Sequence, residues 1–162
     1  ETGPGIMLYG GSPFSSLSAG ALGLEPVMTL KTQISAVHHF RAGDRIGYGG
    51  TFSCPEDMPV GVAAIGYGDG YPRHASTGTP VLVGSRRVAL IGRVSMDSIT
   101  LDLRQAPGTR LGDEVILWGR DLPVEEIAHS AGTINYELLC GLSARVHRLS
   151  MPLAPTSLGK DH

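Results

Sequence analysis

Short apolar runs alternate with turn-forming residues along most of this chain. The first run, residues 27–37, predicts one long strand or two short ones, and the polar turn 41–44 follows it. Regularly spaced short strands of this kind predict a mainly β domain, folded as a compact β-barrel or sandwich. The other runs that predict strands are 60–65, 80–83, 87–91, 98–103 and 114–118.

Glycine and proline separate these runs, with 23 glycines and 11 prolines in 162 residues. They fall at turn positions such as Gly-Asp-Gly at 68–70, Gly-Ser at 84–85 and Ala-Pro-Gly at 106–108. Strands do not alternate with helices along the chain. That pattern and the chain length exclude a Rossmann fold and a complete (β/α)8 barrel.

Helix signals appear only near the C-terminal end. Residues 122–128 begin with proline and two acids, as a helix N-terminus prefers, and Gly132 ends the helix. A second short helix is predicted from Asn135 through 142, with Asn135 as its N-cap, followed by a last strand at 144–149. Residues 13–25 have the small side chains of a linker loop, and 151–162 predict a disordered tail.

Composition and charge exclude several classes of protein. Hydrophobic residues make up 41% of the chain and the net charge is −2, so neither nucleic acid nor a membrane surface is an expected partner. No apolar stretch approaches the roughly 20 residues of a membrane span, and no signal peptide is evident. The two cysteines, Cys54 and Cys140, form no metal-ligand spacing. We therefore expect a cytoplasmic protein without a metal site.

Three segments have compositions that packing alone would not select. Glycines flank tyrosines or charged residues there, which lets the backbone bend tightly and leaves the side chain uncrowded. The segments are 42–51 with Tyr48, 65–73 with Tyr67, Tyr71 and Arg73, and 91–97 with Arg93 and Asp97. Taken singly, each also fits a structural role, with tyrosine between core and solvent or an arginine–aspartate ion pair. Composition alone therefore predicts tyrosine-rich loops and no particular chemistry.

Seven motifs, taken together and in order, resemble the alanine racemase family over residues 4–149. They are PGIMLYG (4–10), PVMTLK (26–31), AGDRIGYGGT (42–51), IGYGDGYPR (65–73), GRVSMD (92–97), GDEV (112–115) and GTINYELLC (132–140). The resemblance implies an enzyme that interconverts L- and D-alanine and supplies D-alanine for bacterial peptidoglycan.

The resemblance also implies an architecture larger than this chain. Family members have an N-terminal (β/α)8 barrel, with pyridoxal phosphate on a lysine, followed by a mostly β domain. They form head-to-tail homodimers in which the β-domain of one subunit completes the active site of the other. Residues 1–12 would then be the end of the cofactor barrel and 26–150 the C-terminal β-domain.

Three residues take direct roles toward the substrate by this resemblance. Tyr48 matches the base that removes the α-proton of L-alanine, opposite the cofactor lysine. Met96 matches the residue whose backbone N–H holds the substrate carboxylate, a task that tolerates almost any side chain. Asp97 would orient the surroundings of that contact.

Five further residues match the pocket and the cofactor site. Tyr67, Arg73 and Arg93 correspond to residues that line the entrance and the pocket. Gly5 and Ile6 correspond to a loop whose backbone amides bind the cofactor phosphate.

The chain departs from the family pattern at several positions. Only Lys31 and Lys160 occur, and neither has the sequence context of the cofactor lysine. Gly3 stands where family members usually have an arginine, and Ala144 where some have a phosphate-binding tyrosine. We therefore predict that this chain alone does not hold pyridoxal phosphate covalently.

Two alternatives to alanine racemase remain. One is the β-domain of a related racemase that acts on serine, lysine or arginine, because pocket size sets that choice. The other is a non-catalytic β-module for dimerisation or ligand binding. Retention of Tyr48, Arg93, Met96 and Asp97 together favours the enzyme.

Overall fold

The computed structural model describes Ser12 and residues 20–151. Gly5 and Ile6, with the rest of residues 1–11, lie outside the described residues, as do 13–19 of the predicted linker and 152–162 of the predicted tail. The rest of the predicted linker includes a short 3-10 helix, η2 (Gly20–Leu22).

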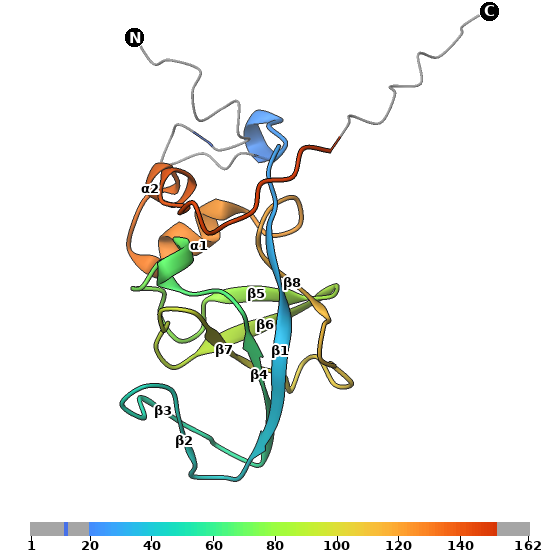
Figure 1. The fold of residues 1–162 in the computed structure, drawn as a ribbon, viewed down its shortest axis with the longest axis vertical. Coiled ribbons are helices and arrows are strands. Elements are labelled where there is room, and N and C mark those ends of the chain that lie inside the picture. Colours follow the sequence, from blue (N-terminus) through green and yellow to red (C-terminus); the bar gives the residue numbers. More distant parts are fainter. Residues whose placement is uncertain (1–11, 13–19, 152–162) are drawn as a thin grey trace, which may run out of the picture.

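Six strands of the described region form a closed barrel, which confirms the prediction of a mainly β domain (Figure 1). Every pair is antiparallel, and the order around the barrel is β1-β4-β7-β6-β5-β8. The strands are β1 (Leu30–Phe40), β4 (Met58–Ala63), β5 (Pro80–Val83), β6 (Arg86–Ile91), β7 (Ile99–Asp102) and β8 (Glu114–Trp118).

Strand β1 closes the barrel by pairing with two partners. Its first residues pair with β8, from Leu30 opposite Trp118, and its later residues pair with β4, ending with Phe40 opposite Met58. The sequence predicted one long strand or two short ones here, and the structure has one. The register shifts between Ile34 and Ala36, where the strand passes from one partner to the other.

A two-stranded ribbon at one end of the barrel was not predicted. It consists of β2 (Arg45–Ile46) and β3 (Phe52–Ser53), each too short to show alternation in the sequence. A separate apolar cluster holds it to the barrel. The buried members of that cluster are Ile46, Cys54, Met58, Val60 and Ile91.

The two helices predicted near the C-terminal end of the sequence are present, and they lie at the end of the barrel opposite the ribbon (Figure 1). Helix α1 (Val124–Ala131) ends at Gly132, whose φ of 67° is left-handed. Helix α2 (Asn135–Cys140) has Ile134 as its N-cap, so Asn135 is already its first helical residue, and it ends two residues before the predicted 142. The predicted N-cap role of Asn135 is therefore wrong.

The predicted last strand at 144–149 is also wrong, since these residues form a turn and an irregular segment. The closed barrel explains the difference. All six of its strands already have two neighbours, so no free edge remains for another strand.

Asn135 instead joins the helices to the N-terminal part of the chain. Its side-chain Nδ2 donates to the carbonyl of Ser12 at 3.0 Å, and the Ser12 N–H donates to Oε1 of Glu125 at 3.0 Å. Asn135 is 8% exposed and Ser12 is 4% exposed. Both helices thus hold one buried residue of the main chain.

Replacing this amide tests its contribution to stability. Asn135→Ala is expected to lower the free energy of unfolding by about 1 kcal/mol, because one buried hydrogen bond is lost. Chemical denaturation of the chain measures the change, with the exposed Cys140→Ala on the same helix as control. Equal denaturation midpoints for the two variants would contradict the assignment.

Candidate functional site

Tyr48 lies at the tip of the ribbon loop and is 85% exposed. The loop is a turn closed by a hydrogen bond of 3.0 Å from the Gly50 N–H to the Gly47 carbonyl. Gly47 has a φ of 83° and Gly49 of 79°, so both need the left-handed freedom of glycine. Ile46, two residues before the tyrosine, is buried in the ribbon cluster. The phenol therefore projects from an anchored turn.

The loop between β6 and β7, residues 92–98, lies against this turn. A Cβ built on Gly47 would be 3.4 Å from the Arg93 backbone nitrogen, and one on Gly92 would be 3.5 Å from the Ile46 carbonyl oxygen. The two backbones thus meet at a pair of glycines. This contact places Tyr48 and Arg93 on neighbouring loops.

Two serines hold the 95–98 segment in a narrow loop. The Ser95 N–H donates to the Ser98 carbonyl at 3.0 Å, and the Ser95 Oγ donates to the same carbonyl at 2.8 Å. Met96 and Asp97 lie at the end of this loop and are exposed. Among the described residues, no group accepts a hydrogen bond from the Met96 N–H. This donor is therefore open to a ligand.

A 3-10 helix, η3 (Tyr67–Asp69), packs on the other side of the same loop. The Tyr67 N–H donates to the Ser95 carbonyl at 3.0 Å, and the Gly68 N–H donates to the Met96 carbonyl at 2.9 Å. The sequence predicted a turn at 68–70, and Gly70 completes it with a φ of 103°. The η3 turn thus fixes the backbone of the residue with the open N–H.

Arg73 lies over the ring of Tyr67, with its guanidinium carbon 5.4 Å from the ring centroid. A cation over an aromatic face is attracted by the ring quadrupole, so this pair orders two exposed side chains. Tyr71 of the same segment is 1% exposed and stacks on Trp118 at 6.3 Å between ring centroids. Burial raises the pKa of Tyr71, so this phenol stays neutral and belongs to the core.

Arg145 joins this group of residues, and sequence reasoning missed it. Its Nη2 contacts Oδ1 of Asp97 at 2.5 Å, and its Nε lies 3.4 Å from Oδ1 of Asp69. The hydrogen bond to Asp97 raises the pKa of Arg145. No local pattern could have revealed this arginine, because its partners lie on two distant loops.

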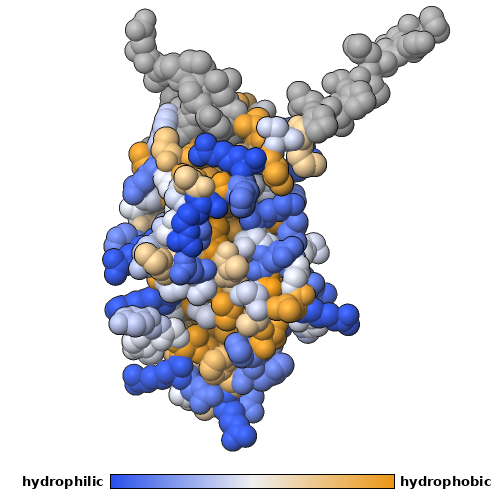
Figure 2. Space-filling model, in the orientation of Figure 1, coloured by the Kyte–Doolittle hydropathy of each residue, from blue (hydrophilic) through white to orange (hydrophobic). Residues whose placement is uncertain are grey.

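The structure therefore brings most of the predicted site residues onto one series of contacting loops. Tyr67, Arg73, Met96 and Asp97 share the η3 turn and the 95–98 loop. Arg93 and Tyr48 lie next to this group, where the ribbon meets the loop between β6 and β7. The contact there is between the backbones of the two loops. Hydrophilic residues are otherwise scattered over the surface, as Figure 2 shows for one face.

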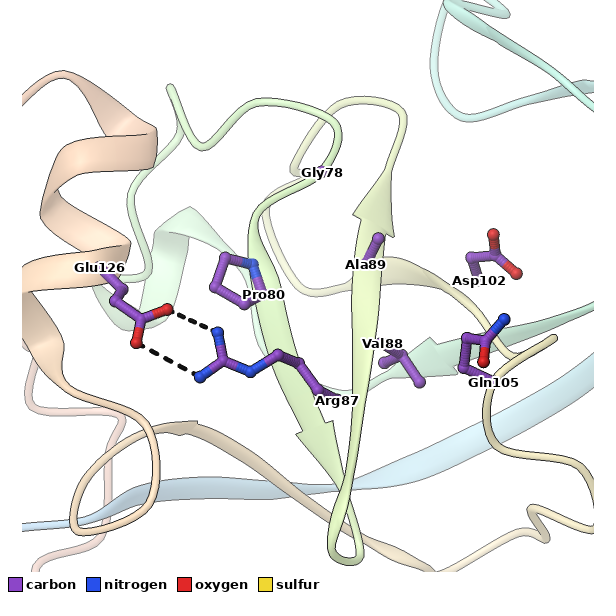
Figure 3. Close-up of a pocket in the computed structure, with 8 residues that line it drawn as sticks. All are labelled: Gly78, Pro80, Arg87, Val88, Ala89, Asp102, Gln105 and Glu126. Atoms are coloured by element: carbon purple, nitrogen blue, oxygen red, sulfur yellow. Dashed lines mark hydrogen bonds and ion pairs between the residues drawn. The ribbon is translucent and has the colours of Figure 1, made fainter.

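A surface pocket lies elsewhere, on the outer side of β5 and β6. Arg87 of β6 reaches across it to Glu126 of α1, with contacts of 2.6 and 3.3 Å (Figure 3). Asp102 and Gln105 lie on the far side of this pocket. None of the predicted site residues lines it. The Arg87–Glu126 pair on one side of the pocket links the barrel to the helix.

The described residues do not fit a covalent pyridoxal phosphate site. Their only lysine is Lys31, at the surface of β1, where its Nζ forms an ion pair with Oε2 of Glu114 at 2.9 Å. A Schiff-base lysine needs a deprotonated amine and a phosphate site nearby. Lys31 instead faces a carboxylate, so no lysine among the described residues suits this attachment.

Comparison with known proteins decides the family. The family model described as "Alanine racemase, C-terminal domain" matches residues 27–150. The chain belongs to the alanine racemase family. Within the residues that the structure describes, no helix has the length and apolar character to cross a membrane.

Named relatives agree with this membership of the alanine racemase family. The alanine racemase of Nitrosococcus oceani is 63% identical over 145 residues, which cover 90% of this chain and 41% of that protein. An alanine racemase sequence from Piscirickettsia salmonis is 55% identical, over 88% of this chain and 86% of that sequence. The crystal structure of the biosynthetic alanine racemase from Pseudomonas aeruginosa superposes with a TM-score of 0.86 at 49% identity, over 88% of this chain and 40% of that one.

Proposed function

We propose that this chain acts as the C-terminal domain of an alanine racemase that interconverts L- and D-alanine with pyridoxal phosphate. The observation that carries the proposal is the contact series from the exposed Tyr48 to the open Met96 N–H, formed by the same motifs that mark the family. Identities of 55–63% to proteins named alanine racemase support alanine over serine, lysine or arginine as the substrate.

Tyr48 is proposed to carry a proton at its phenol oxygen. A phenol with its reference pKa near 10 is a weak base unless a neighbouring cation stabilises the phenolate. The exposed ring on an anchored turn suits a residue that enters a site formed by another part of the enzyme. Positioned acid–base groups of this kind act at the substrate α-carbon.

The Met96 N–H is proposed to hold the substrate carboxylate. A backbone donor that is fixed on both sides, by Ser95 and by the η3 turn, can bind a carboxylate oxygen in a defined direction. Asp97 would orient this loop, and Tyr67, Arg73 and Arg93 would line the approach to it. Gly5 and Ile6, which lie outside the described residues, would contribute amides toward the cofactor phosphate.

The remaining parts of the proposed enzyme lie beyond this chain. We propose an N-terminal (β/α)8 barrel with the cofactor lysine and a head-to-tail homodimer in which Tyr48 serves the partner's site. A cytoplasmic location and a role in peptidoglycan supply accord with this activity. Neither nucleic acid nor a membrane surface is a proposed partner.

The direct test is to express the complete natural gene that encodes this chain and to assay racemisation of L-alanine. Formation of D-alanine, detected with a D-amino-acid oxidase, is the expected result. A complete gene product that racemises serine, lysine or arginine faster than alanine would replace the proposed substrate. A product with no racemase activity would overturn the proposal of an enzyme and favour the alternative of a non-catalytic β-module.

A second test concerns the cofactor and the isolated chain. Incubation with pyridoxal phosphate followed by borohydride is expected to leave Lys31 without stoichiometric label, because Lys31 is paired with Glu114 at the surface. Mass spectrometry of the reduced chain measures the labelling at this residue. Full labelling of Lys31 in the unchanged chain would contradict the expectation, and the Glu114→Gln variant shows how far the ion pair affects the reaction.

A further inference from the structure

The C-terminal segment that follows α2 packs directly on the η3 turn. The Ser143 N–H donates to the Asp69 carbonyl at 3.0 Å. A Cβ built on Gly70 would lie 2.7 Å from the Cα of Leu142, so the two backbones approach closely. This irregular segment, which leads into the residues predicted as a strand, therefore covers the turn that supports the 95–98 loop.

Arg145 extends this contact to the 95–98 loop itself. Its guanidinium lies between two carboxylates, 2.5 Å from Asp97 on the loop and 3.4 Å from Asp69 in the turn. The second oxygen of Asp69 accepts a hydrogen bond of 2.9 Å from the Gly66 N–H. Gly68 leaves room for the arginine, because a Cβ at that position would collide with its Nη1. One side chain thus joins three segments of the chain.

The charges favour a positioning role for this arginine over direct binding of an anion. Two carboxylates face one guanidinium, so the group of three carries a net negative charge when all are ionised. An incoming carboxylate would be repelled by Asp69 and Asp97. The donor open to a carboxylate is instead the Met96 N–H. The carbonyl of the same residue accepts a hydrogen bond from the Gly68 N–H of the turn.

We propose that Arg145 is a positioning residue that fixes the 95–98 loop against the η3 turn and so sets the direction of the Met96 N–H. It acts through Asp97 and Asp69 and does not touch the substrate. The effect on substrate binding by the Met96 N–H rests on the proposed function. The structural link between Arg145, Asp97 and Asp69 does not depend on any activity.

Hydrogen exchange of the 162-residue chain tests the structural link. The Tyr67 and Gly68 amides donate to Ser95 and Met96. In Arg145→Ala we expect these amides to exchange about two- to tenfold faster, because partly exposed ion pairs contribute only modestly to stability. Arg148→Ala removes the same charge from an exposed position in the same segment and serves as the matched control. Arg145→Lys keeps the charge and should restore part of the protection.

The outcomes of this exchange experiment are decisive in each case. Unchanged exchange at Tyr67 and Gly68 in Arg145→Ala would overturn the proposal. Equal acceleration of the amides of β6 and β7 would overturn it as well, because the arginine would then support the whole fold. If Arg148→Ala accelerated exchange as much as Arg145→Ala, the effect would come from net charge alone, and this outcome would also overturn the proposal.

Steady-state kinetics of the complete racemase test the consequence for binding. Arg145→Ala is expected to raise the KM for alanine about tenfold and to change kcat less, because ground-state binding of the carboxylate is what weakens. A fall in kcat with an unchanged KM would contradict the positioning role. A complete wild-type protein without racemase activity would overturn the proposed function, and the exchange experiment would still decide the structural link.

Discussion

Tyr48→Phe in the complete racemase that we propose is expected to lower the rate of racemisation by about 10²–10⁴-fold, the usual loss for a positioned acid–base group. The substitution keeps the ring and removes only the oxygen that is proposed to carry the proton. Because the side chain is 85% exposed, its loss of a hydroxyl should leave the stability of the domain unchanged. Tyr136→Phe, at a partly exposed tyrosine on α2, is the matched control.

The loss is expected to differ between the two enantiomers. A base on one face of the substrate removes the α-proton of L-alanine only, so exchange of that proton should fall most. Exchange from D-alanine, whose proton lies on the opposite face, should survive better. Deuterium incorporation from solvent into each enantiomer measures both rates. Equal losses, or racemisation at the wild-type rate, would remove Tyr48 from the role of base.

Gly66→Ala is expected to disrupt the candidate site through the backbone. A Cβ at this position would overlap the carbonyl oxygens of both Ser95 and Met96, which are main-chain atoms and cannot rotate away. The loop must therefore move from the η3 turn, and the hydrogen bonds from Tyr67 and Gly68 must lengthen. Overpacking of this kind costs about 1–3 kcal/mol, and more where backbone has to shift.

Two measurements separate this effect from a general loss of stability. Chemical denaturation of Gly66→Ala should show the lower free energy of unfolding, and the KM for alanine should rise in the complete racemase. Gly20→Ala is the matched control, because nothing lies within 4 Å of a Cβ at that position. If Gly66→Ala matched Gly20→Ala in both measurements, the close approach of the turn and the loop would be refuted.

The sequence predicted the strands well where alternation was local. Strands β5 and β8 have the predicted bounds, since each is a short apolar run with a turn on either side. The ribbon of β2 and β3 was missed because each strand has two residues and depends on a tertiary cluster. The last predicted strand failed for a different reason, because pairing requires a free edge and a closed barrel has none.

The candidate site shows the same division between local and long-range information. Motifs singled out Tyr48 and the loop of Met96, since glycines and polar residues mark unusual backbone in the sequence itself. Arg145 gave no such signal, because its role depends on Asp69 and Asp97 from other parts of the chain. Asn135 was wrongly predicted to be an N-cap, because its side chain bonds instead to Ser12, a partner that only the folded chain reveals.

The closure of the barrel by β1 has a consequence for biosynthesis. Strand β1 is made early, yet its first residues pair with β8, the last barrel strand to be synthesised. Until β8 emerges from the ribosome, the backbone groups of Leu30–Gln33 have no ladder partner. An unpaired strand edge is a template for association with other chains. The nascent domain is thus most exposed to aggregation until β8, through Trp118, has emerged from the ribosome.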